Sequence, residues 1–175
     1  DTPYGIAIIS GTGSNGYAID PQGQEAHVSG RGLYMADEGG GAMIGWDALH
    51  AMTQAEDGRG PNTALLPAIL AHFKTKDTAA LTSIVNHPTF EKRDLGELNR
   101  IVEECAAQGD RIAKEILKEA ANDLLLMADT LHRRLTWQRG EVPVVLIGGT
   151  INRNHIVRQH FMKGARKRKW MNAIP

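Results

Sequence analysis

The chain is short of several features that would assign a protein to a class. It has a single cysteine, Cys105, so it can form no internal disulfide and offers no pair of thiols to zinc or to an iron–sulfur cluster. The helix-like sequence around Cys105 favours a buried, structural thiol over a catalytic one. A lone thiol is typical of proteins from a reducing compartment, so we expect a cytoplasmic location.

Net charge, long apolar runs and metal-binding patterns are also missing. Lys and Arg total 20, as do Asp and Glu, so no global field favours nucleic acid or an anionic membrane as a partner. No apolar run approaches the roughly 20 residues that span a bilayer. The seven histidines show no spacing of the H-E-x-x-H type, so we assign no metal site to them. A chain of 175 residues fits one domain, which is large enough to bury a hydrophobic core without disulfides or bound metal ions.

The first 30 residues have the pattern of a three-stranded antiparallel meander. Short strands are predicted at 4–9, 16–20 and 24–29, and Pro21-Gln22-Gly23 supplies turn chemistry between the second and the third. The first strand is a continuous apolar run, which is typical of a strand buried on both faces.

The rest of the chain is mostly helical by hydrophobic periodicity. Helices are predicted at 42–54, 62–73, 78–86, 95–107, 111–136 and 152–168. The helix at 111–136 carries one apolar stripe, which indicates core packing: Ile112, Ile116, Ala120, Leu124, Met127 and Leu131. A β-branched run at 142–147 predicts a buried central strand. The chain starts without Met and ends where another strand could begin, so we expect a fragment of a longer protein.

A glycine-rich segment, Gly11-Thr12-Gly13-Ser14-Asn15-Gly16, matches the letters of the dinucleotide-binding fingerprint G-x-G-x-x-G. That fingerprint requires a helix to begin within the loop, so that its N-terminus meets the pyrophosphate. Here the loop leads instead into the strand at 16–20 and a Pro-Gln-Gly turn. A Walker A loop fails as well, because no Gly-Lys-Ser/Thr follows. The segment is therefore predicted to be a hairpin loop.

A hairpin loop of this composition can bind phosphate. Glycine lets the backbone come close to an anion and turn its N–H groups toward it. Thr12 and Ser14 add hydroxyl donors without a repelling charge. The alternative is an ordinary turn rich in small residues, and the loop alone does not decide between the two.

Two further segments are candidate site edges. In the segment 30–41, Asp37 and Glu38 lie between glycines. Either one of them caps the next helix, or Asp37 accepts hydrogen bonds from substrate hydroxyls. Three consecutive glycines at a helix start weaken the helix, which suggests close approach by a ligand or another chain segment. Gly148 and Gly149 follow the strand at 142–147 and either leave bare backbone for a flat ligand or form a tight turn with Asn152 as helix cap.

The order of these motifs resembles the superfamily of sugar kinases, heat-shock proteins and actin. More narrowly, the chain is similar to the C-terminal domain of N-acetylglucosamine kinases and of the BadF/BadG/BcrA/BcrD ATPase family. The matching stretches are Ile8 to Asn15, Gly30-Arg31-Gly32, Asp37-Glu38-Gly39 with Ile44-Gly45, and Gly148-Gly149. Arg31 stands where animal kinases of this type have an aromatic residue, so the resemblance does not fix the sugar.

The resemblance implies an α/β fold of the RNase-H-like, actin-like ATPase kind, with residues 1–175 as its C-terminal ATPase/sugar-kinase domain. ATP with Mg²⁺ and an amino sugar would bind in a cleft shared with an N-terminal domain of the same protein. It implies phosphate or ATP contacts for one set of residues: Gly11, Thr12, Gly13, Ser14, Gly148 and Gly149. It implies sugar contacts for Asn15, Gly32 and Asp37.

The resemblance places the general base and the first phosphate motif in the N-terminal domain, so no catalytic residue is expected in this chain. The predicted function is ATP-dependent phosphorylation of an amino sugar such as N-acetylglucosamine. The alternatives are an activator ATPase of the same family and a non-catalytic module that senses sugar or nucleotide. A homodimer is a candidate assembly that the sequence does not decide.

Overall fold

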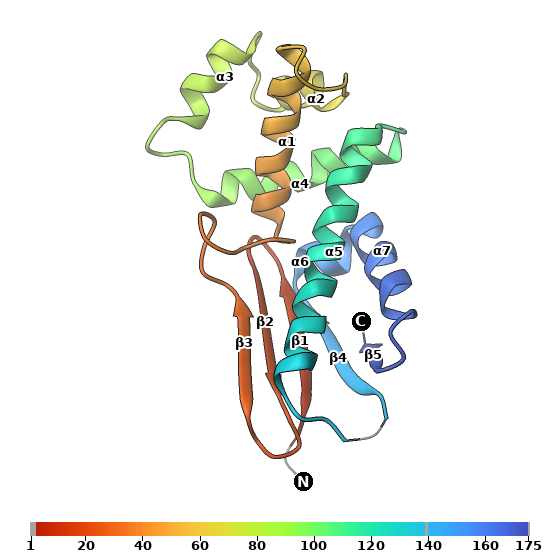
Figure 1. Ribbon diagram of the computed structural model, residues 1–175. Helices are drawn as coiled ribbons and strands as arrows, with labels where there is room; N and C mark the ends of the chain where they lie inside the picture. The colour runs from red at the N-terminus through yellow and green to blue at the C-terminus, as the bar shows by residue number, and fades with distance from the viewer. Residues whose placement is uncertain (1–2, 139, 175) are drawn as a thin grey trace.

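The computed structural model of the protein describes residues 3–138 and 140–174, which are organised on a five-stranded sheet (Figure 1). The strands are Gly5–Ser10 (β1), Ser14–Ile19 (β2), Glu25–Ser29 (β3), Val142–Ile147 (β4) and Met171–Ile174 (β5). Their order is β3-β2-β1-β4-β5, with β1 to β3 antiparallel and β4 and β5 parallel to β1. The expected α/β fold, with an antiparallel meander and further strands, is confirmed.

The helices lie mainly beyond one end of the sheet. They are Gly41–Glu56 (α1), Leu65–His72 (α2), Thr78–Val85 (α3), Lys92–Ala107 (α4), Arg111–Arg134 (α5), Gly149–Arg153 (α6) and His155–Ala165 (α7). Figure 1 shows α1 to α4 as a helical half above the sheet, and α5 running from that half down along the strands. No described helix combines the length and hydrophobicity needed to cross a membrane.

The apolar stripe of α5 forms the centre of the core, as predicted. Ala120, Leu124, Met127 and Leu131 are buried, while the stripe's first two isoleucines pack against the core partly buried. Helix α5 contacts all three strands of the meander. The sequence prediction for Cys105 is confirmed too, because its side chain is buried within the same core.

The sheet is covered by helices on one face. Strand β1 alternates between buried residues, such as Ile6 and Ile8, and partly exposed ones. On β4, Val145 and Ile147 are 40% and 45% exposed. The prediction that these strands are buried on both faces is therefore wrong within the described residues. A continuous apolar run fits a one-sided strand as well, so its sequence alone does not reveal which face is covered.

The predicted helix at 152–168 is wrong as a single element, because the chain breaks at Asn154. The Asn154 side chain accepts a hydrogen bond from the Val157 N–H at 3.1 Å and so caps α7. It also donates to Asn99 Oδ1 at 3.0 Å, which ties α7 to α4. Helix α6 already begins at Gly149, so Asn152 is not a helix cap.

Close packing of α1 against α4 depends on Gly45. A Cβ atom at Gly45 would lie 2.0 Å from the Leu95 carbonyl oxygen and 3.2 Å from Leu98 Cβ. The backbones of the two helices therefore nearly touch at this crossing. The contact sets where the first turn of α4 lies relative to the sheet.

We predict that Gly45→Ala destabilises the fold by about 2 kcal/mol or more, although alanine alone favours a helix by about 1 kcal/mol. The cause is the fixed backbone of Leu95, which has to move. Gly164→Ala is the matched control, because there the added Cβ meets the end of a flexible side chain, Leu125 Cδ1, at 2.3 Å. Urea unfolding of both variants checks the prediction. A Gly45→Ala protein as stable as the parent would contradict it.

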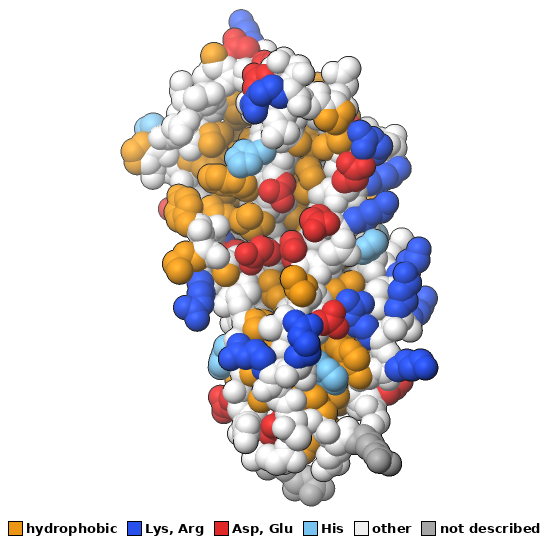
Figure 2. Space-filling model, viewed as in Figure 1, with side chains coloured by type: hydrophobic (Ala, Val, Ile, Leu, Met, Phe, Trp, Pro, Cys, Tyr) orange, Lys and Arg blue, Asp and Glu red, His pale blue; other side chains and the backbone are white. Residues whose placement is uncertain are grey.

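A cluster of carboxylates lies where α5 faces α1 and the segment before it. Burial raises the pKa of Asp123 to about 6, with further contributions from Glu119, Glu38 and Asp47. Figure 2 shows acidic side chains gathered across the middle of this face. Among the described residues no group of His, Cys, Asp and Glu is arranged to hold a metal ion. The cluster is therefore a source of mutual repulsion near neutral pH.

We predict that Asp123→Asn stabilises the protein at pH 7 to 8 and has no such effect below about pH 4. The pKa of Asp123 is about 6 in the folded protein and 3.8 in its ordinary state. Between these two pH values the folded state binds more protons than the unfolded state, so the folded state loses stability as the pH rises from 3.8 to about 6. Urea unfolding from pH 4 to 8 measures the difference. Glu97→Gln, which alters an exposed carboxylate on α4, is the control. If Asp123→Asn raised the free energy of unfolding by the same amount at every pH, the explanation by charge repulsion would be wrong.

Candidate functional site

The candidate site is built around the turn between β1 and β2. Ser10 pairs with Ser14 across the two strands, which leaves Gly11, Thr12 and Gly13 as the turn. The Gly11 N–H donates to the Gly13 carbonyl at 2.9 Å and closes it. Strand β2 begins two residues earlier than predicted, so Ser14 and Asn15 are strand residues and their positions are fixed by the sheet.

The carbonyl groups of Gly11 and Thr12 point at the helices. The Gly11 carbonyl accepts from the Gly41 N–H and from Thr150 Oγ1, each at 2.8 Å, and the Thr12 carbonyl accepts from the Ala42 N–H at 2.9 Å. A trans peptide holds its N–H opposite its C=O. The N–H groups of Thr12 and Gly13 therefore point away from α1 and α6.

These two N–H groups are available to a ligand. No described residue accepts a hydrogen bond from the Thr12 or the Gly13 N–H. Thr12 is exposed and Gly13 partly exposed, so water or an anion can reach both. Consecutive backbone N–H groups that point the same way form a concave site for an anion.

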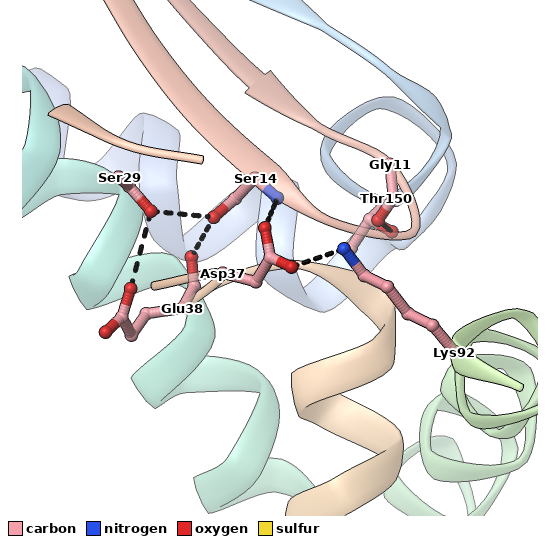
Figure 3. Close-up of polar contacts among 7 residues, drawn as sticks. All are labelled: Gly11, Ser14, Ser29, Asp37, Glu38, Lys92 and Thr150. Atoms are coloured by element: carbon pink, nitrogen blue, oxygen red, sulfur yellow. Dashed lines mark hydrogen bonds and ion pairs between the residues drawn. The ribbon is translucent and has the colours of Figure 1, made fainter. Parts of the chain in front are cut away.

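Asp37 holds the base of the turn. It is 3% exposed, and its Oδ1 accepts from the Ser14 N–H at 3.2 Å. Its Oδ2 forms an ion pair with Lys92, the first residue of α4. Figure 3 shows that each of the two donors contacts a different oxygen of the carboxylate. Sequence reasoning missed Lys92, because it lies 55 positions after Asp37 and no motif links the two residues.

The segment after Asp37 is bonded to the same strands. Ser14 Oγ donates to the Glu38 carbonyl, and Ser10 Oγ donates to the Gly39 carbonyl, both at 2.6 Å. Helix α1 begins after Gly40 with no side-chain cap, so the alternative in which Asp37 or Glu38 caps this helix is wrong.

The three glycines before α1 allow the hairpin turn to approach the helix. A Cβ at Gly40 would lie 2.7 Å from the Gly13 carbonyl carbon, and one at Gly41 would lie 3.0 Å from Thr150 Oγ1. The close approach expected from the triple glycine is thus made by another segment of the same chain.

Gly148 and Gly149 differ in what they do. Gly148 has φ of +110°, and a Cβ there would lie 2.4 Å from the Ser10 carbonyl oxygen, so glycine is required for the turn beside β1. Gly149 is exposed, with no atom within 4 Å of where a Cβ would be. The next residue, Thr150, contacts the Gly11 carbonyl, so Gly149 leaves bare backbone next to the hairpin turn.

Of the three predicted sugar-contacting residues, Asn15 and Asp37 lie next to Ser14, and no contact joins Gly32 to them among the described residues. Asn15 follows Ser14 on β2, and its Oδ1 is buried without a hydrogen-bond partner among the described residues. A Cβ at Gly30 would lie 2.9 Å from Asn15 Cγ, which shows how closely that loop covers the side chain. Gly32 lies in the same exposed loop, where the Ala36 N–H bonds to its carbonyl at 2.9 Å. A buried amide oxygen without a hydrogen-bond partner is uncommon in folded proteins.

A reactive thiol plays no part in this site. Burial raises the pKa of Cys105, and the carboxylates of Asp110 and Glu104 raise it further. The thiol therefore stays protonated at neutral pH, and it lies in the core formed by α4.

The chain is similar in sequence to proteins of known name and in fold to solved structures. Over 159 residues the chain is 35% identical to the N-acetylmuramic acid/N-acetylglucosamine kinase of Clostridium acetobutylicum, covering 91% of this chain and 52% of that protein. It is 30% identical over 156 residues to the N-acetyl-D-glucosamine kinase of Dictyostelium discoideum, covering 88% and 49%. The chain therefore spans about half the length of the curated relatives it matches.

A solved structure shows the same fold. The putative N-acetylglucosamine kinase from Chromobacterium violaceum superimposes with a TM-score of 0.78 at 28% identity, covering 98% of this chain and 55% of that one. This agreement confirms the expected actin-like ATPase fold. Residues 1–169 match the BadF/BadG/BcrA/BcrD ATPase family over nearly the whole chain, and the chain belongs to that family.

Proposed function

We propose that residues 1–175 form the C-terminal half of the active-site cleft of an ATP-dependent kinase that phosphorylates N-acetylglucosamine or a related amino sugar. The observation that carries the proposal is the β1–β2 turn, whose Thr12 and Gly13 N–H groups point outward without acceptors among the described residues. Membership of an ATPase family and two relatives named as amino-sugar kinases support it.

In this proposal the turn binds the phosphates of ATP. The N–H groups of Thr12 and Gly13 and the Thr12 hydroxyl donate to the γ-phosphate, and Gly11 leaves room for it because nothing lies within 4 Å of its Cβ position. Ser14 is buried with both donors used inside the protein, so its contribution is to hold the turn. The backbone at Gly148 and Gly149 takes the adenosine.

Magnesium enters this site with the nucleotide. Mg²⁺ keeps several waters and is usually held by phosphates with one or two carboxylates, so an all-protein cage is not needed. Phosphoryl transfer then depends on positioning and on neutralising charge on the moving group. Residues 1–175 supply hydrogen-bond donors that position the phosphates and neutralise their charge. We place the carboxylates that bind Mg²⁺ in the remaining half of the protein.

The sugar contacts lie beside Ser14. The side-chain amide of Asn15 hydrogen-bonds one sugar group. Asp37 accepts a hydrogen bond from a sugar hydroxyl, using lone pairs that are not occupied by Ser14 and Lys92. Gly32 lets the exposed loop approach the ring.

The γ-phosphoryl group passes from ATP to a sugar hydroxyl, ADP leaves, and the hydroxyl proton goes to a general base. We place that base in the remaining half of the protein, and a cytoplasmic location and a homodimer stay predictions.

We predict that a preparation of residues 1–175 alone has no measurable kinase activity, because half a cleft supplies neither the base nor the first phosphate motif. Adding the rest of the full-length protein should restore turnover. A coupled ADP-release assay against a panel of amino sugars, with the full-length protein as positive control, measures both. Turnover by a 175-residue preparation free of other kinases would contradict the division of the cleft.

In the full-length protein, we predict different kinetic effects for Thr12→Ala and Asp37→Asn. Thr12→Ala should lower kcat/KM for ATP about two- to tenfold, the range for one lost hydrogen bond, whereas Thr12→Ser should stay near the parent. Asp37→Asn should raise KM for the sugar by roughly tenfold, because a charged acceptor is lost. Steady-state kinetics, with circular dichroism to confirm folding, separate the two. Binding of sugar and ATP without any phosphorylation would favour the sensing module instead.

A further inference from the structure

Lys92 lies at the centre of the candidate site although it belongs to a distant part of the sequence. It is the first residue of α4, and its Nζ forms an ion pair with Asp37 Oδ2. Nζ would also lie 2.6 Å from a Cβ at Gly13, so the ammonium group is directly beside the hairpin turn. Figure 3 shows the side chain extending from α4 to the carboxylate.

The ammonium group has hydrogen-bonding capacity left over. A lysine side chain carries three N–H donors, and the structure gives this one a single acceptor, Asp37. The side chain of Lys92 is 38% exposed, while that of Asp37 is 4% exposed. Asp37 therefore fixes the ammonium group from the buried side, and the remaining donors face the solvent side.

The turn needs a cation to bind a highly charged ligand well. Its own donors are neutral N–H groups and a hydroxyl. Within the part of the chain that the structure describes, Lys92 is the one cation that forms an ion pair with a residue holding the turn. Hydrogen bonds to a charged partner are stronger than neutral ones, so one ammonium group at this place outweighs a further backbone donor.

We infer that Lys92 binds a phosphate oxygen of the nucleotide at the β1–β2 turn, with Asp37 holding its ammonium group in place. The inference rests on the proposed function, because it assigns one more contact within that site. The phosphate joins Asp37 as a second acceptor, and the Asp37–Lys92 pair is retained. Lys92 then supplies the positive charge that the turn lacks, from a helix positioned by the Gly45 crossing.

The test measures binding of MgATP, MgADP and adenosine to the full-length protein by calorimetry. Lys92→Met removes the charge and Lys92→Arg keeps it, while Arg93→Met removes the exposed cation at the next position as a matched control. Each Lys92 change is also made together with Asp37→Asn. In that background no buried carboxylate is left unpaired, so a folding defect cannot hide the result.

We expect Lys92→Met to weaken the binding of MgATP and MgADP about tenfold or more, in both backgrounds, and to leave the affinity for adenosine unchanged. The Arg93→Met control should bind all three ligands as the parent does. Lys92→Arg should retain most of the affinity. Equal affinities of parent and Lys92→Met for MgATP would overturn the inference. So would an equal loss of affinity for adenosine, since Lys92 would then support the fold of the site and not a phosphate contact. A full-length parent that binds no MgATP would instead overturn the proposed function itself.

Discussion

The orientation of two peptide groups governs what the candidate site can bind. The carbonyls of Gly11 and Thr12 are held by the start of α1 and by Thr150, so the N–H groups on the other side of the same peptides face outward. Had these carbonyls no partners in the fold, the turn could rotate and present oxygen instead of hydrogen to a ligand. An acceptor oxygen would repel a phosphate. The packing of α1 and α6 against the hairpin is thus the source of the anion-binding character of the turn.

Three glycines make this packing possible, each in a different way, because glycine has no side chain. Gly40 lets the backbone of the turn lie against the helix start, and Gly148 takes a backbone conformation that other residues avoid. Gly45 brings α4 close enough for Lys92 to meet Asp37. Of the three, only Gly45 lies inside a helix, where glycine lowers helix stability. The arrangement therefore gives up some stability of α1 for a short distance between α1 and α4.

The parts of the fold that follow from local pattern were predictable, and so was the position of the turn. Alternation and turn residues located the meander, and the stripe on α5 located the core. The break at Asn154 had a local signal, because asparagine is a common helix cap, but the periodicity on both sides of it predicted one continuous helix. Lys92 had no local signal, since its role comes from a partner 55 positions away. The exposed face of β4 was missed because an apolar strand has the same sequence whether one face or both are covered.

The bond from Thr150 to Gly11 joins residues 139 positions apart, and β1 pairs with β4 over a similar separation. During synthesis, the hairpin is complete long before the ribosome has added β4 and α6. Contacts between such remote residues form late, because a long loop must be closed first. The glycine turn therefore spends this interval with one edge of β1 unpaired and the Gly11 carbonyl lacking its partner at Thr150. A nascent chain that ends before residue 150 therefore has the motif and its bonds to α1, but it lacks the third hydrogen bond that orients the turn.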